Sequence, residues 1–103
     1  MIFYLALGSN LSPRHQHIDA ACRLLEERVG IILARSSDFF SPAWGYESDH
    51  EYLNIALRLQ TSHSPLEVLD LTQQIERELG RTIKGRYADR TIDIDLIRCF
   101  SDD

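Results

Sequence analysis

The sequence predicts an α+β fold in which two helices cover one face of an antiparallel sheet. Three observations support this prediction. Apolar residues recur at helical spacing in two segments, and four other segments alternate or are rich in branched and aromatic side chains. Serine-proline pairs stand where both helices would begin, and glycines stand where they would end. With 103 residues, 44% of them hydrophobic, the chain can bury one core, so we expect a single domain.

The first half of the chain predicts a strand, a helix and a second strand. Residues 1–7 are apolar but short and lack a basic leader, which is typical of a first strand and not of a signal peptide. Ser12 and Pro13 predict a helix start, with the serine as cap and the proline in the first helical position, for a helix over residues 13–29. Residues 31–40 predict one long strand. The apolar stripe of the helix comprises Ile18, Cys22, Leu25 and Val29.

The second half predicts a loop, a strand, a helix and a last strand. Residues 41–50 contain a proline, a glycine and a polar run, which are typical of a loop. Apolar and other residues alternate over positions 52–60, as they do in a strand. Ser64 with Glu67 three positions later predicts a capping box, for a helix that reaches about Leu79. Its buried stripe is Val68, Leu71, Ile75 and Leu79, whereas Gln73 and Glu76 are expected on a more polar side. The order strand-helix-strand-strand-helix-strand is that of a ferredoxin-like sandwich, which leaves the other sheet face open.

The last predicted strand, residues 90–97, carries two carboxylates on one face. Successive side chains of a strand point to opposite faces, so Asp93 and Asp95 share one face and the apolar residues between and beside them share the other. Two neighbouring carboxylates suit Mg²⁺, which completes its coordination with water and substrate phosphates. The alternative is a solvated face of an amphipathic strand.

The positive charge of this acidic chain is concentrated just before that strand. The formal net charge of −5 argues against general affinity for nucleic acid or for an anionic membrane. Five of the eleven lysines and arginines nevertheless fall between positions 77 and 90: Arg77, Arg81, Lys84, Arg86 and Arg90. Beside a carboxylate-bound Mg²⁺ they would hold phosphates; alone they would be a solvated basic loop.

A second group of residues predicts a site for a flat ligand. Trp44, Tyr46, Tyr52 and Asn54 lie in or near a loop that contains proline and glycine. Such side chains can sandwich and read a planar heterocycle, although aromatic residues near a strand end are more commonly core or rim. The two cysteines, Cys22 and Cys99, are too few for a zinc site or a disulfide framework, so we expect a reduced, cytoplasmic protein.

Together these motifs resemble the 6-hydroxymethyl-7,8-dihydropterin pyrophosphokinase family of folate biosynthesis. The matching pieces, in order, are residues 4–11, Ser41-Pro42 with Gly45, Tyr52-Leu53-Asn54, Gln73 with Glu76, Gly80-Arg81 and residues 90–95. Each motif is weak alone, but their joint order over almost the whole chain is specific.

The resemblance implies transfer of pyrophosphate from ATP to the hydroxymethyl group of the dihydropterin, with release of AMP. It implies that Asp93 and Asp95 bind two Mg²⁺ ions and that Arg81 and Arg90 stabilise charge on the phosphates. It further assigns the pterin to Ser41, Pro42, Ala43, Trp44, Tyr52 and Asn54. The nucleotide is assigned to Gln73, Glu76, Arg81, Lys84, Arg86 and Arg90. The expected partners are therefore small molecules, with no nucleic acid and no membrane, and the expected state is a monomer.

Family members continue past the position that matches Asp103, so we expect residues 1–103 to form a pyrophosphokinase-like domain that lacks the family's C-terminal segment. Two readings follow. The chain is a pyrophosphokinase, or it is a non-catalytic pterin- or nucleotide-binding module derived from that family. The paired carboxylates Asp93 and Asp95 favour the enzyme, because a pure binding module has little need of a metal platform.

Overall fold

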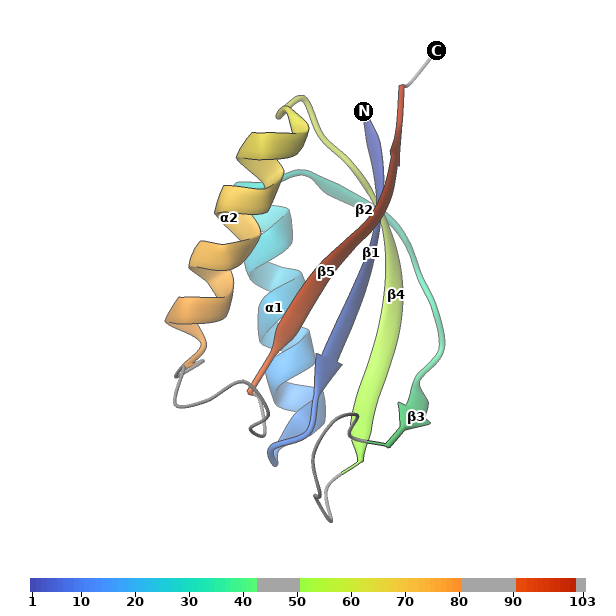
Figure 1. Cartoon of the computed structure of the whole chain (residues 1–103), viewed down its shortest axis with the longest axis vertical. Coiled ribbons are helices and arrows are strands. Elements are labelled where there is room, and N and C mark those ends of the chain that lie inside the picture. The colour runs from blue at the N-terminus through green and yellow to red at the C-terminus, as the bar shows by residue number, and fades with distance from the viewer. Residues whose placement is uncertain (43–50, 81–90, 102–103) are drawn as a thin grey trace.

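The computed structural model describes residues 1–42, 51–80 and 91–101, and these form two helices and a five-stranded antiparallel sheet. The elements are β1 Ile2–Ser9, α1 Arg14–Arg28, β2 Ile31–Arg35, β3 Phe39–Ser41, β4 Tyr52–Gln60, α2 Pro65–Glu78 and β5 Asp93–Phe100. The strand order is β2-β4-β1-β5, with β3 paired to β4 (Figure 1). This arrangement confirms the predicted α+β, ferredoxin-like fold.

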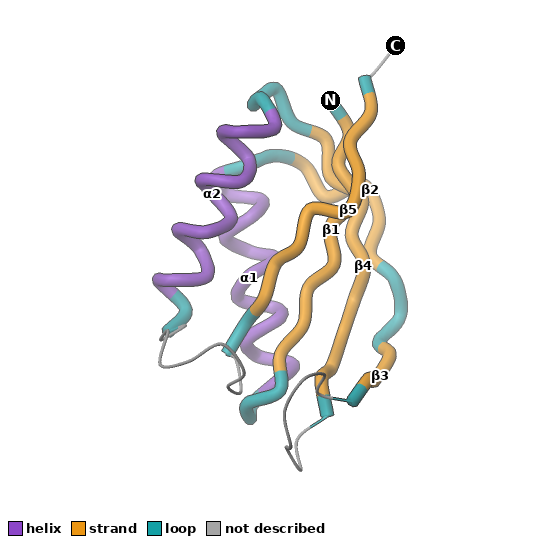
Figure 2. Tube along the Cα trace, viewed as in Figure 1, coloured by secondary structure: helices purple, strands orange, loops and turns teal. Residues whose placement is uncertain are grey.

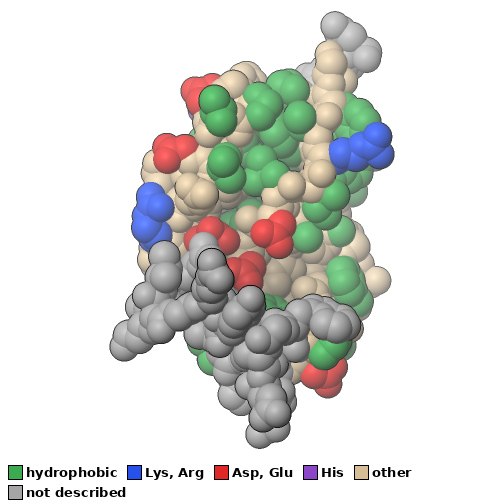
Figure 3. Space-filling model, viewed as in Figure 1, with side chains coloured by type: hydrophobic (Ala, Val, Ile, Leu, Met, Phe, Trp, Pro, Cys, Tyr) green, Lys and Arg blue, Asp and Glu red, His purple; other side chains and the backbone are tan. Residues whose placement is uncertain are grey.

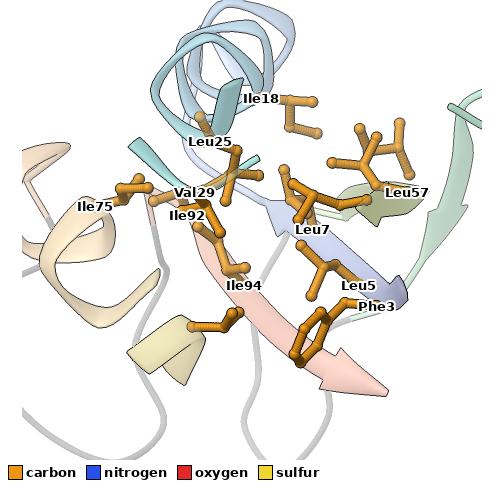
Figure 4. Packing of buried hydrophobic residues seen from close by; sticks show 14 of the residues in the cluster. Phe3, Leu5, Leu7, Ile18, Leu25, Val29, Leu57, Ile75, Ile92 and Ile94 are labelled. Atoms are coloured by element: carbon orange, nitrogen blue, oxygen red, sulfur yellow. The ribbon is translucent and has the colours of Figure 1, made fainter. Parts of the chain in front are cut away.

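Both helices lie on the same side of the sheet (Figure 2). The buried hydrophobic cluster contains residues of both helices and of the sheet. Alternate residues of the central strand β1 point into this core; Phe3, Leu5 and Leu7 are each at most 1% exposed. Figure 4 shows Ile75 of α2 close to Ile92, which precedes β5. The face of the sheet away from α1 and α2, here called the open face, carries the intervening side chains of β1, β4 and β5. No described helix is long and apolar enough to cross a membrane.

The two helix starts differ from each other. At α2 the predicted capping box is present: Ser64 Oγ accepts from Glu67 N at 3.3 Å, and Glu67 Oε1 accepts from Ser64 N at 2.8 Å. At α1 the predicted serine cap is wrong. Pro13, not Ser12, occupies the capping position in an extended conformation, and no side chain among the described residues caps the helix there. Proline has no hydroxyl to offer, so the capping residue itself supplies no side-chain acceptor to the first turn of α1.

The predicted single strand over residues 31–40 is also wrong, because the chain forms two short strands there. Between β2 and β3 three residues stand opposite two residues of β4, which leaves one extra residue. Ser36 bridges the interruption: its backbone N donates to Ala56 O at 2.9 Å, and its Oγ accepts from Ala56 N at 2.8 Å. A side-chain oxygen thus takes the place of the backbone carbonyl that a continuous strand would supply.

Candidate active site

The candidate site is built on the open face around Gly8 of β1. Gly8 stands opposite Asn54 of β4 on one side and opposite Asp93 of β5 on the other. These three residues therefore form one row across three strands. A second row, two residues along, consists of Ala56, Ala6 and Asp95. The central strand carries only the small residues Gly8 and Ala6 in these rows. The carboxylates of β5 and the amide of β4 therefore border one area of the open face, here called the floor.

Asp93 and Asp95 share the open face, as the alternating pattern predicted. Ile92 and Ile94 are 0% and 6% exposed on the helix side, whereas Asp93 is half-buried and Asp95 is exposed. Figure 3 shows acidic side chains gathered where β5 runs beside α2. Two carboxylates two residues apart supply hard oxygen ligands of the kind that Mg²⁺ takes.

The carboxylates of Asp93 and Asp95 would need further ligands to complete the coordination of a Mg²⁺ ion. Among the described residues no group of three or more His, Cys, Asp and Glu side chains could hold a metal by itself. Asp93 and Asp95 would therefore provide only part of the coordination shell. Mg²⁺ commonly uses one or two carboxylates and completes its octahedron with water and phosphate oxygens, so the pair fits this ion.

Asn54 is held in place by β3 and by its own strand. Its Nδ2 lies 2.9 Å from Ser41 Oγ, 3.3 Å from Phe39 O and 3.2 Å from Tyr52 O. The opposite end of the amide, Oδ1, lies beside Gly8, 3.0 Å from the place where a Cβ would stand on that residue. The structure therefore brings Ser41, Tyr52 and Asn54 together, with the Asn54 oxygen directed over the floor.

Gly8 is a site residue whose role the sequence did not reveal. A Cβ at this position would also lie 3.3 Å from Tyr52 Cδ1, so the absence of a side chain lets Tyr52 and Asn54 approach the central strand. A glycine inside a strand pattern is the signal that could have identified it, because such a glycine commonly marks a close approach of another group.

The two expected nucleotide-binding residues of α2 occupy different environments. Gln73 is exposed, as predicted, but Glu76 is only 5% exposed, which corrects its expected place on a polar side. Its Oε2 accepts a hydrogen bond from Ile94 N at 2.7 Å. The spacing contains the signal that was missed: the buried residues of α2 are Val68, Thr72, Ile75 and Glu76, which is one helical stripe.

The remaining predicted site residues lie outside the described residues. Ala43 and Trp44 belong to residues 43–50, and Arg81, Lys84, Arg86 and Arg90 belong to residues 81–90. Pro42, the last described residue before the first of these segments, is exposed. The described part of the site is thus the metal-type carboxylate pair, the Asn54 amide with its supports, and the α2 residues behind β5.

A hollow of about 370 Å³ on the open face shares Ala56 with the second row of the site. It is lined by Tyr4, Ile97, Arg98 and Phe100 with Leu5 and Ala56. The ring of Tyr4 meets the ring of Phe100 edge-on at 5.7 Å, and Arg98 lies over Phe100. None of the predicted site residues that the structure describes lines this hollow.

Comparison with known proteins identifies one family. Residues 4–100 match the family model described as 7,8-dihydro-6-hydroxymethylpterin-pyrophosphokinase. A Porphyromonas gingivalis protein named 2-amino-4-hydroxy-6-hydroxymethyldihydropteridine pyrophosphokinase is 48% identical over 99 residues, which cover 93% of this chain and 67% of the relative. A Bacillus subtilis protein of the same name is 40% identical over 97 residues, 93% of this chain and 58% of the relative.

A third relative, from Lactococcus lactis, carries the matching region within a larger protein. It is named bifunctional protein FolKE and is 38% identical over 96 residues, which cover 91% of this chain and 27% of the relative. The chain thus spans about two thirds or less of the length of these three relatives.

Proposed function

Because the chain belongs to the 7,8-dihydro-6-hydroxymethylpterin-pyrophosphokinase family, we propose that it catalyses the reaction for which the family is named. It transfers pyrophosphate from MgATP to the hydroxymethyl group of 6-hydroxymethyl-7,8-dihydropterin in folate biosynthesis, and AMP leaves. The observation that carries the proposal is the row formed by Asn54, Gly8 and Asp93. The Asn54 amide and the Asp93 carboxylate lie on opposite sides of one small residue, and this register supports a pterin beside the amide and a metal beside the carboxylate.

Asp93 and Asp95 are the proposed ligands of two Mg²⁺ ions. When bound, these ions supply charge neutralisation on the ATP phosphates and orient the reacting oxygens. Asp95 is exposed and Asp93 is half-buried on β5, so neither residue is closed off from solvent. Solvent access is needed for the water and phosphate oxygens that would complete the coordination.

The dihydropterin is proposed to lie over Gly8, against Tyr52 and Asn54. Strands in a sheet are about 4.8 Å apart, so Asn54 and Asp93 are separated by roughly 10 Å across β1. That span accommodates a ring on the Asn54 side and the acceptor hydroxymethyl group near the metal side. Ser41 and Pro42 border this position, and Ala43 and Trp44 are proposed to complete the pterin contacts.

The phosphates and the nucleotide are proposed to engage the basic segment. Arg81 and Arg90 would stabilise charge on the transferring phosphates, and Lys84, Arg86 and Gln73 would contact the nucleotide. The chain has eleven lysines and arginines against sixteen acidic residues, so the concentration of cations between positions 77 and 90 supports this assignment. We further propose that the protein is a cytoplasmic monomer; both described cysteines, Cys22 and Cys99, are free thiols.

The decisive assay is AMP release from ATP that depends on both Mg²⁺ and the dihydropterin. We expect Asp93→Ala and Asp95→Ala each to lower turnover by at least about 100-fold, because several kcal/mol of charge stabilisation pass through these ligands. Dihydropterin binding, measured by calorimetry, should be largely retained in both variants. Asp70→Ala removes an exposed carboxylate of α2 and serves as the matched control.

Two results would count against the proposal. Equal loss of dihydropterin affinity in both aspartate variants would contradict the division between metal and pterin residues. Absence of AMP release from the wild-type protein, with dihydropterin or ATP still bound, would favour the non-catalytic binding module instead.

A further inference from the structure

Glu76 is a buried carboxylate that bonds the backbone between the two aspartates of the candidate site. Its side chain lies in the buried stripe of α2 and is 5% exposed. Its Oε2 accepts from Ile94 N at 2.7 Å, a short and well-formed hydrogen bond for an amide donor. Ile94 is the single residue that separates Asp93 from Asp95.

The Ile94 N–H that Glu76 accepts points away from β1, so Glu76 links β5 to α2. In the strand order β5 is an edge strand, with β1 on one side and no strand among the described residues on the other. Backbone N–H groups of an edge strand that do not face the neighbouring strand are left for other acceptors. Glu76 occupies that place for Ile94, as a neighbouring strand would, and ties β5 to α2.

Glu76 is a carboxylate in a helical stripe whose other buried members are Val68, Thr72 and Ile75. Ile75 of α2 and Ile92 before β5 are both fully buried (Figure 4). Burying a carboxylate is unfavourable unless hydrogen bonds compensate for its lost hydration. The hydrogen bond from Ile94 N supplies such compensation, and it ties the carboxylate to the Asp93–Ile94–Asp95 backbone.

We propose that Glu76 is a positioning residue for the metal carboxylates, acting through Ile94 N and not by contact with ATP. The proposal rests on the proposed function, because it assigns Asp93 and Asp95 to the metal. Holding the central amide sets the pleat of β5, and the pleat sets the direction and spacing of the two flanking side chains. Groups that orient metal ligands typically change metal affinity or activity by about 10- to 100-fold when removed.

The test compares Glu76→Leu, Glu76→Gln and the matched control Glu78→Leu on the same helix. Glu78 is exposed and pairs with Arg28 at the surface, so its replacement removes a carboxylate without touching β5. Mn²⁺ is titrated in the presence of α,β-methylene-ATP. We expect Glu76→Leu to weaken Mn²⁺ binding by about 10- to 100-fold and Glu78→Leu to leave it unchanged.

Further measurements distinguish the loss of carboxylate positioning from a general loss of structure. Glutamine retains an acceptor oxygen, so Glu76→Gln should restore most of the Mn²⁺ affinity. Hydrogen exchange of the Ile94 amide should accelerate in Glu76→Leu and stay close to wild type in Glu76→Gln. Affinity for α,β-methylene-ATP in EDTA should not change in either variant, because Glu76 does not contact the nucleotide.

The proposal is overturned if folded Glu76→Leu binds Mn²⁺ as tightly as the wild type. It is also overturned if Glu76→Gln loses as much Mn²⁺ affinity as Asp95→Ala, a result that stays informative even where the leucine variant does not fold. Both outcomes leave pyrophosphate transfer standing. A wild-type protein that exchanges Ile94 slowly but releases no AMP would instead defeat the proposed function and leave the Glu76–Ile94 clamp intact.

Discussion

Gly8 of β1 and Asn54 of β4 face each other so closely that a Cβ on Gly8 would lie 3.0 Å from Asn54 Oδ1. The Asn54 amide cannot easily swing away, because its Nδ2 is held by Ser41 Oγ and by two backbone carbonyls. The orientation of the amide over the open face therefore depends on a missing side chain on the neighbouring strand.

Gly8→Ala is expected to weaken dihydropterin binding by about tenfold, or roughly 1.4 kcal/mol. The added methyl group must displace Asn54 Oδ1 and Tyr52 Cδ1, which stand 3.0 and 3.3 Å from its position. Isothermal titration with the dihydropterin measures the effect, and thermal melting verifies that the variant is folded.

The double variant Gly8→Ala/Asn54→Ala supplies the control for this prediction. If the methyl group acts by displacing the Asn54 amide, its cost should largely vanish once that amide is gone. Full additivity of the two substitutions would show that Gly8→Ala acts by another route.

Gly30→Ala is expected to destabilise the fold by about 3 kcal/mol. A Cβ on Gly30 would lie 2.1 Å from Gln60 O and 2.9 Å from Thr61 Cβ, so the backbone of the β4 end would have to move. Urea denaturation monitored by circular dichroism gives the free energy of unfolding, and the loss should appear in the midpoint at an unchanged slope.

Gly80→Ala is the comparison for that measurement, because its cost has a different origin. Gly80 has a φ of +93° at the end of α2, and the nearest atom to its Cβ position, Thr91 Oγ1, is 3.9 Å away. The strain is conformational alone, about 1 kcal/mol. An equal loss in both variants would contradict the steric explanation for Gly30.

The parts of the fold that were predictable from the sequence are those whose determinants are local. The capping box of α2 needs only Ser64 and Glu67, and both of its hydrogen bonds are present. The strand predicted over residues 52–60 has the same bounds as β4. Every second side chain of this strand is buried in the core, so the alternation is visible in the sequence itself. Asp93 and Asp95 fall on one face for the same reason.

The features that were not predictable depend on partners far along the chain. The break between β2 and β3 exists because Ser36 bonds Ala56, twenty residues away, and nothing in residues 31–40 identifies that partner. Glu76 is buried where it accepts from Ile94 N, on the side of β5 that no described strand occupies. Propensity treats glutamate as a surface residue, whereas a tertiary hydrogen bond accompanies the burial of Glu76 here.

Ser36→Ala should lower the free energy of unfolding by about 1 kcal/mol. The substitution removes the oxygen that accepts from Ala56 N at 2.8 Å, so this amide should also exchange faster with solvent. Ser36→Thr retains the hydroxyl and should recover most of the loss, and Ser37→Ala tests the same truncation at the adjacent position. Unchanged exchange at Ala56 in Ser36→Ala would contradict the bridging role of this side chain.

The Glu67 carboxylate should make stability depend on pH in the acidic range. The backbone amide of Ser64, followed by its hydroxyl, holds the pKa of Glu67 below its ordinary value of 4.5. The folded state therefore binds fewer protons, so the stabilising effect is complete above pH 4.5 and is lost as pH falls through the lowered pKa. Urea denaturation of wild type and Glu67→Gln should diverge at pH 7 and converge in acid. In a Ser64→Ala background, which keeps the backbone amide, the convergence should persist; its disappearance would assign the effect to the hydroxyl instead.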